Sequence, residues 1–135
     1  MSTPTDTPAL SRRDRNTLLA LVLLLIALAA WFADVQQEGP YLLRNLLPPM
    51  FVILLAWLGL RRGPNPRILL SAAGFAIPAV GLSAYLHYAY SVNLNELFAG
   101  STQPEQVFRF LPIYTSGAGL IGAAIGWIVG RNLSN

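Results

Sequence analysis

Four long apolar stretches alternate with short polar segments along the chain. The first, TLLALVLLLIALAAWFA from Thr17 to Ala33, holds no charged residue. At a helical rise of 1.5 Å per residue, this run reaches about 26 Å, close to the roughly 30 Å of hydrocarbon in a bilayer. The pattern predicts four membrane-spanning helices, at about 17–34, 42–60, 68–90 and 107–130.

The second stretch is the least regular, because Arg44, Asn45 and the pair Pro48–Pro49 interrupt it. One possibility is that its helix starts near Tyr41, with the Arg44 side chain reaching to the lipid headgroups. The other is that the helix begins at the proline pair after a short interfacial segment, since prolines are well tolerated at a helix start. The pattern leaves both alternatives open.

The segments on either side of the third stretch define the remaining connections. The turn RRGPNPR at 61–67 is short, so we expect the second and third helices to be antiparallel neighbours. Thr102 and Glu105 fit a capping box, which predicts that the fourth helix starts near Gln103 and enters the membrane at about Phe110. No internal repeat or second domain is visible.

The fold class expected from this pattern is all-α, an integral membrane bundle of four transmembrane helices at 17–131. Residues 1–16 are polar and contain two prolines, which predicts a disordered cytoplasmic tail, and residues 132–135 form a second short tail. A cleaved signal peptide is the rival interpretation of the first stretch. Basic residues at 12–15 precede the leucine-rich core, and Ala27-Leu28-Ala29 resembles a cleavage site.

Composition supports a membrane protein over a water-soluble one. Apolar residues make up 54% of the chain and charged residues 11%, far below the roughly 25% that soluble domains carry. The net charge of +3 does not predict nucleic-acid binding, because the basic residues flank apolar runs and are typical of topology signals and headgroup contacts. These residues are Arg12, Arg13, Arg15, Arg61, Arg62, Arg67 and Arg131. The absence of cysteine excludes disulfides and thiolate chemistry.

The distribution of arginine predicts the orientation. With four spans, one side holds those seven arginines, and the other holds Arg44 and Arg109 together with most of the acidic residues. Short loops rich in arginine stay in the cytoplasm. We therefore expect both termini inside (N-in/C-in), and a multi-pass protein of the bacterial cytoplasmic (inner) membrane.

Small residues recur on one face of the fourth predicted helix, at nearly every fourth position. They are Ala118, Gly119, Gly122, Gly126 and Gly130. Such a groove allows close backbone approach, a main source of helix–helix contact energy in lipid. The stripe predicts tight helix packing, either within the chain or against a partner protein or a second copy.

The third predicted helix places Gly74, Pro78, Gly81 and Tyr85 on one face. Pro78 cannot donate to the carbonyl of Gly74, so a kink is expected there. The small residues Gly74, Pro78 and Gly81 predict a helix-packing face, which could also line a pathway or hold a ligand. Proline kinks are also common in static bundles.

The sequence contains few residues that could bind a cofactor or transfer a proton. His87 is the single histidine, so it can supply neither bis-histidine haem ligation nor a zinc site, and no cofactor is expected. We expect an interfacial histidine bonded to a loop carbonyl or water, or else a proton-linked group with Asp34 or Glu96 as its partner. Tyr85 and Tyr114 are further polar candidates for a pathway.

The sequence favours a non-catalytic function. No ionisable residue lies in the middle of a predicted span, which argues against a proton- or cation-coupled transporter. The serines lack a nearby base, so an enzyme is not expected. The leading hypothesis is an accessory or assembly subunit of a larger membrane complex that acts through helix–helix packing. The alternative is a small channel or transporter built from several copies.

Overall fold

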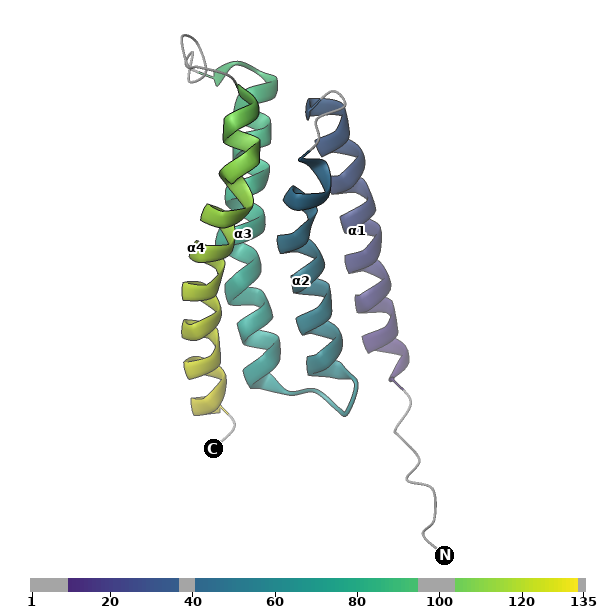
Figure 1. Cartoon of the computed structure of the whole chain (residues 1–135). Coiled ribbons are helices and arrows are strands. Elements are labelled where there is room, and N and C mark those ends of the chain that lie inside the picture. The colour runs from purple at the N-terminus through teal and green to yellow at the C-terminus, as the bar shows by residue number, and fades with distance from the viewer. Residues whose placement is uncertain (1–9, 37–40, 95–103, 134–135) are drawn as a thin grey trace, which may run out of the picture.

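In the residues that it describes, the computed structural model consists of four α-helices (Figure 1). It describes residues 10–36, 41–94 and 104–133. The helices are α1 (Arg12–Gln36), α2 (Leu42–Leu60), α3 (Pro66–Ser91) and α4 (Pro104–Leu133). Each is long and apolar enough to cross a membrane, which confirms the prediction of an all-helical chain with four candidate spans.

The first helix begins at Arg12, so residues 12–16, expected in the tail, are helical instead. The reason lies in Ser11 and Asp14. The Ser11 hydroxyl accepts a bond from the amide of Asp14 at 3.1 Å and donates to the Asp14 carboxylate at 2.6 Å. This reciprocal cap satisfies an amide that the helix itself leaves without a partner. Residues 1–9 of the expected tail lie outside the described residues.

The start of α2 distinguishes the two alternatives left by the sequence. The helix begins at Leu42 and continues through Pro48 and Pro49, both of which are buried. Arg44 therefore lies in the first turn of the helix, where its guanidinium stacks 5.9 Å from the centre of the Tyr41 ring. The predicted capping residue Thr102 of the last helix lies outside the described residues, and α4 begins at Pro104.

The turn between α2 and α3 is built from residues suited to it. Gly63 has a φ of +96°, a conformation that costs a residue with a side chain about 1–2 kcal/mol. The Asn65 side chain then caps α3 by accepting bonds from the amides of Arg67 and Ile68 at 3.1 and 3.4 Å. Pro66 follows at the first helical position, where its missing amide proton is not needed.

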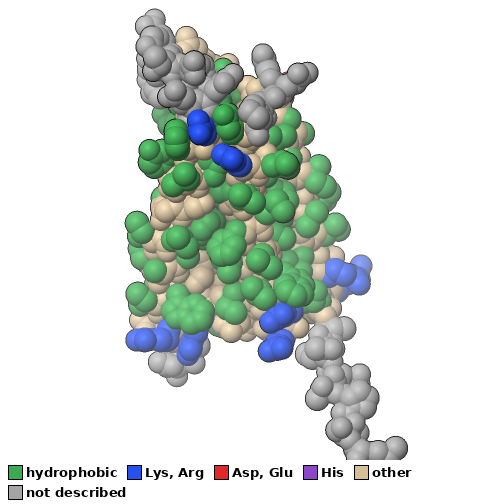
Figure 2. All heavy atoms as spheres, viewed as in Figure 1, with side chains coloured by type: hydrophobic (Ala, Val, Ile, Leu, Met, Phe, Trp, Pro, Cys, Tyr) green, Lys and Arg blue, Asp and Glu red, His purple; other side chains and the backbone are tan. Residues whose placement is uncertain are grey.

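The helices form one bundle, in which α3 and α4 lie side by side along their length (Figure 1). Helix α2 packs against α3, and α1 lies on the far side of α2 from α4. The first turn of α1, the last turn of α4 and the α2–α3 turn lie at one end of the bundle, which we call the arginine-rich end (Figure 1). Figure 2 shows apolar side chains over the middle of one face, with arginines toward its two ends.

The buried core has two parts. Val52, Phe75 and Ala79 meet in the middle of the bundle. Val35, Phe108 and Leu111 meet nearer the opposite end, where α1 and α4 also approach α3. Much of the remaining apolar surface faces outward, as a bilayer allows.

Candidate functional site

Helices α3 and α4 meet through the backbones of Gly74 and Gly122. A Cβ atom added to either glycine would collide with the carbonyl oxygen of the other. Pro78 explains why the Gly74 carbonyl is free to face α4, because proline has no amide proton to offer the carbonyl four residues earlier. The two glycine backbones are therefore placed for weak Cα–H···O contacts, which recur where helices approach this closely.

The same contact repeats toward the arginine-rich end. A Cβ on Gly126 would collide with the carbonyl oxygen of Leu70. One on Gly130 would lie 2.7 Å from the carbonyl oxygen of Pro66. A glycine at every fourth position of α4 thus faces a carbonyl at every fourth position of α3, and the two helices are in register over about two turns.

Side chains reinforce this interface. The hydroxyl of Ser71 donates to the carbonyl of Ala123 at 3.1 Å. Gly119 packs against the Phe75 ring, whose Cε2 atom would lie 2.7 Å from an added Cβ, and Ala118 is half-buried nearby. Gly119 and the three later glycines of the stripe therefore pack within the chain, so this stripe is not left open for a partner.

Helix α1 is attached differently and leaves an apolar groove against α2 and α3. The groove has a volume of about 300 Å³ and lies in the middle of the apolar region. Its lining comes from three helices and consists of Leu21, Leu24, Leu25, Leu28, Pro49, Val52, Ile53, Ala76, Ile77, Val80 and Gly81. The chain thus presents a hydrocarbon-lined hollow midway along three of its candidate membrane spans.

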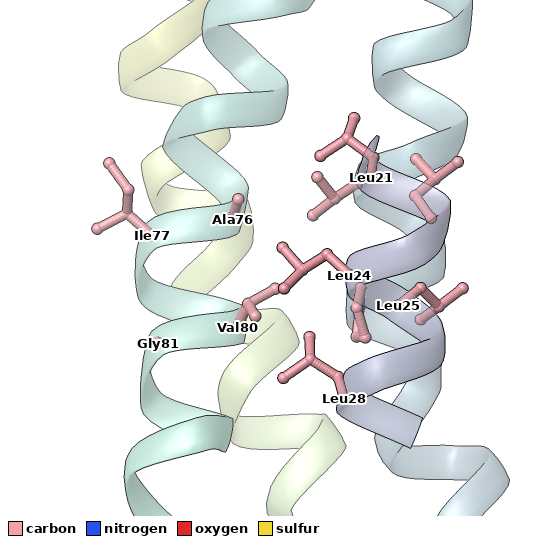
Figure 3. Close-up of a pocket in the computed structure, with 11 residues that line it drawn as sticks. Leu21, Leu24, Leu25, Leu28, Ala76, Ile77, Val80 and Gly81 are labelled. Carbon is pink, nitrogen blue, oxygen red and sulfur yellow. The ribbon is translucent and has the colours of Figure 1, made fainter. Parts of the chain in front are cut away.

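The walls of this groove are set by residue size. In Figure 3 the side chains of Leu24 and Val80 point toward one another across it. Gly81, predicted to lie in a helix-packing face, has no atom within 4 Å of an added Cβ and forms part of the wall instead. The side chain of a larger residue at position 81 would therefore extend into open space in the groove.

A buried polar cluster lies at the end of the bundle opposite the arginine-rich end. His87 is fully buried, with Nδ1 2.8 Å from the Ser83 carbonyl and Nε2 2.8 Å from Nε2 of Gln36. Because the Gln36 amide nitrogen donates, Nε2 of His87 accepts and the ring proton lies on Nδ1. The Phe32 ring stacks on the imidazole with centroids 3.6 Å apart and planes at 9°.

This environment differs from the one expected for His87. Its carbonyl partner belongs to the same helix, one turn earlier, and its other partner is an amide of α1. Asp34, predicted as a possible proton-linked partner, has an exposed side chain, and Glu96 lies outside the described residues. The structure therefore presents His87 as a ring packed among aromatic groups and bonded to neutral partners.

Asn45 belongs to the same end of the bundle and was not identified as a site residue from the sequence. Its side chain is 1% exposed, and Nδ2 donates to the carbonyls of Tyr41 and Phe108, each at 3.1 Å. Pro112 lies four residues after Phe108 and lacks the amide proton that would normally satisfy that carbonyl. The sequence shows Asn45 and Pro112 separately but does not show that they come together, because they lie in different helices.

Three polar side-chain atoms in this part of the chain are buried without a hydrogen-bond partner among the described residues. They are Oε1 of Gln36, Oδ1 of Asn45 and Oγ of Ser83. The cluster is confined to one end of the bundle. Toward the middle, the core turns apolar at Phe75 and Ala79.

The residues predicted to line a pathway are not brought together. Tyr85 and Tyr114 are 50% and 68% exposed on the outer surface. Gly74 is used in the α3–α4 interface, whereas Gly81 lies in the groove. Thr115 is fully buried, but its hydroxyl is bonded to the Leu111 carbonyl of its own helix at 3.0 Å.

The predicted topology and headgroup arginines lie near the arginine-rich end. The Arg61 guanidinium stacks over the Trp57 ring, 5.1 Å from its centre. Arg61 and Arg67 are half-buried. The exposed members of the set are Arg12, Arg13, Arg15, Arg62 and Arg131.

Among the described residues, no group of three histidine, cysteine, aspartate or glutamate side chains is placed to hold a metal ion. Comparison of the chain with protein-family models, curated proteins and solved structures finds no match.

Proposed function

We propose that this chain is a small non-catalytic protein of the bacterial inner membrane, an accessory or assembly subunit that binds a partner through the outer surface of α1. Both termini face the cytoplasm in this proposal. It is supported by the distribution of arginine, because every arginine except Arg44 and Arg109 belongs to the arginine-rich end. Short segments rich in arginine are retained in the cytoplasm when a membrane protein inserts.

The observation that carries the partner proposal is the weak attachment of α1. Only 11% of its candidate span is buried inside the chain, against 39% for α2, 28% for α3 and 17% for α4. The buried residues of α1 are Phe32 and Val35, both close to its C-terminal end. Leu19, Leu23 and Ile26 share one face and are 58%, 58% and 59% exposed. A partner helix has a long, regular surface to pack against there.

We place the docking surface on α1 and not on α4 because the glycine stripe of α4 is already in contact with α3. Those glycines are in contact with α3, so a partner would have to displace α3 to use them. In lipid, apolar exposure does not itself drive association, and shape-matched packing must supply the contact energy. Helix α1 remains accessible without disturbing the α3–α4 interface.

The test is native mass spectrometry of the protein purified in mild detergent from cells that express it at its natural level. We expect one other membrane protein in fixed stoichiometry. Replacing Leu19, Leu23 and Ile26 with alanine should remove this partner. The matched control replaces Ile121, Ile125 and Ile128 of α4, which have the same spacing and are 68%, 59% and 57% exposed.

Two outcomes would contradict the proposal. Equal loss of the partner in both triple variants would mean that α1 has no special role. A complex containing only copies of this chain would instead support the oligomeric channel or transporter, which flux measurements in liposomes would then test.

A further inference from the structure

We propose that the groove between α1, α2 and α3 binds one acyl chain of an anionic phospholipid, and that Arg13 holds the phosphate of that lipid. The lipid comes from the leaflet around the arginine-rich end. This site is separate from the partner surface of α1, since Leu19, Leu23 and Ile26 do not line the groove.

The chemistry of the lining selects the acyl chain. The groove holds about 300 Å³, and its wall side chains, such as Leu24, Leu28 and Val80, are apolar. Water in such a hollow would lack the two to four polar partners that it needs. An empty groove would forfeit dispersion contacts along its walls. At this depth in a bilayer, the molecules available to fill it are lipid hydrocarbon chains.

The size of the groove fits a segment of one chain. A water molecule occupies about 30 Å³ in the liquid, so the groove equals about ten such volumes. A methylene group is of similar size, and part of a single acyl chain therefore fills the space. Gly81 keeps the wall open, because no atom lies within 4 Å of an added Cβ there.

The position of Arg13 on α1 determines where the lipid headgroup would bind. Arg13, Thr17, Ala20 and Leu24 follow one another at spacings of three and four residues, so they share one face of α1. Arg13 is exposed and lines a second hollow, formed by α1 residues alone, with Asn16 and Thr17. From Leu24 to Arg13 the axial distance is about 17 Å, within reach of a phospholipid whose tail enters the groove. Arginine at this level attracts anionic headgroups.

The experiment titrates the purified protein in detergent with phosphatidylglycerol or phosphatidylcholine and counts bound lipids by native mass spectrometry. We expect one phosphatidylglycerol to be retained most tightly. Gly81→Leu should reduce its binding at least tenfold by filling the groove. Gly117→Leu is the matched control, because Gly117 also has no atom within 4 Å of an added Cβ but does not line the groove.

A second pair of variants covers the possibility that Gly81→Leu fails to fold. Leu24→Trp places a larger ring at the groove, whereas Leu120→Trp changes a leucine of similar exposure on α4 that neither lines the groove nor belongs to the partner surface of α1. Only the former should displace lipid. Arg13→Gln should weaken phosphatidylglycerol binding about fivefold and leave phosphatidylcholine unchanged, as expected for one arginine at a membrane surface.

Equal lipid binding by both members of each pair would overturn the groove as the site. Equal effects of Arg13→Gln on the two lipids would overturn the headgroup assignment. If Gly81→Leu releases a bound protein while lipid binding is unchanged, the groove is a docking site for a partner helix instead. Loss of the partner in the α1 triple alanine variant is measured separately, so the two proposals can fail independently.

Discussion

At the scale of single residues, Gly74 and Gly122 determine how closely α3 and α4 approach. Each lies against the carbonyl oxygen of the other, so neither position has room for a side chain. Pro78 contributes by leaving the Gly74 carbonyl without its usual helical donor. Two residue types with low helix propensity, glycine and proline, thus both contribute to this close contact.

We predict that Gly122→Ala destabilises the protein by about 1–3 kcal/mol, the usual cost of inserting an atom into a packed contact. The added Cβ meets the Gly74 carbonyl, which belongs to the backbone and cannot rotate away. The free energy of unfolding is measured by denaturant titration in mixed micelles, followed by circular dichroism.

The control for this prediction is Gly117→Ala on the same helix. An added Cβ has no atom within 4 Å at Gly117, and alanine favours helix over glycine by about 1 kcal/mol, so this variant should be neutral or slightly stabilising. If the two variants unfold at the same denaturant concentration, close approach at Gly122 is not a determinant of stability.

At the scale of helices, Asn45 joins α2 to α4 through a carbonyl that α4 itself cannot satisfy. Pro112 leaves the Phe108 carbonyl without a helical donor, and the Asn45 side chain supplies one at 3.1 Å. In lipid, an unsatisfied backbone carbonyl is costly because no water is present to bond it. The contact therefore fixes the position of α2 relative to α4 at this level of the bundle.

We predict that Asn45→Ala lowers the free energy of unfolding by about 0.6–2 kcal/mol, the range for hydrogen bonds between transmembrane helices. The cost should shrink when Pro112→Ala is also present, because an alanine at that position would supply the missing amide proton to the Phe108 carbonyl. A double-mutant cycle measures this coupling. Additive effects of the two substitutions would show that the Phe108 carbonyl is not what Asn45 stabilises.

At the scale of helices, some features of the structure can be predicted from the sequence and others cannot. The number of helices follows from the apolar runs, because each span must satisfy its own backbone hydrogen bonds. The early start of α1 was also visible in principle, since Ser11 and Asp14 have capping spacing. The role of Asn45 was not, because it depends on a proline in a different helix.

Candidate sites were harder to predict, for a related reason. The glycine stripe of α4 predicts close packing, but the residues that fill it, such as Leu70 and Gly74, lie on another helix and are known only once the register is known. The groove lies between leucines of α1 and residues of α2 and α3. It depends on the distance between these helices, which a local sequence pattern does not predict.

At the scale of the whole molecule, the chain divides into a closely packed α3–α4 pair and an α1 that is attached mainly near one end. The close pair is held by backbone contacts over about two turns. Helix α1 contributes Phe32, Val35 and Gln36 to the end of the bundle opposite the arginine-rich end and little burial elsewhere. This asymmetry creates both the groove and the free surface on which the two proposals rest.

The proposed orientation makes a prediction that the cysteine-free sequence renders simple to test. Single cysteines at Ser11, Asn132 and Val92 occupy exposed positions, the first two at the arginine-rich end and the third at the other. In bacterial spheroplasts, a membrane-impermeant maleimide should label Val92→Cys at once and label Ser11→Cys and Asn132→Cys only after lysis, because arginine retains its end in the cytoplasm. The opposite pattern would reverse the orientation and place the Arg13 lipid site in the outer leaflet, whereas labelling of Ser11→Cys and Asn132→Cys on different sides would require an odd number of spans.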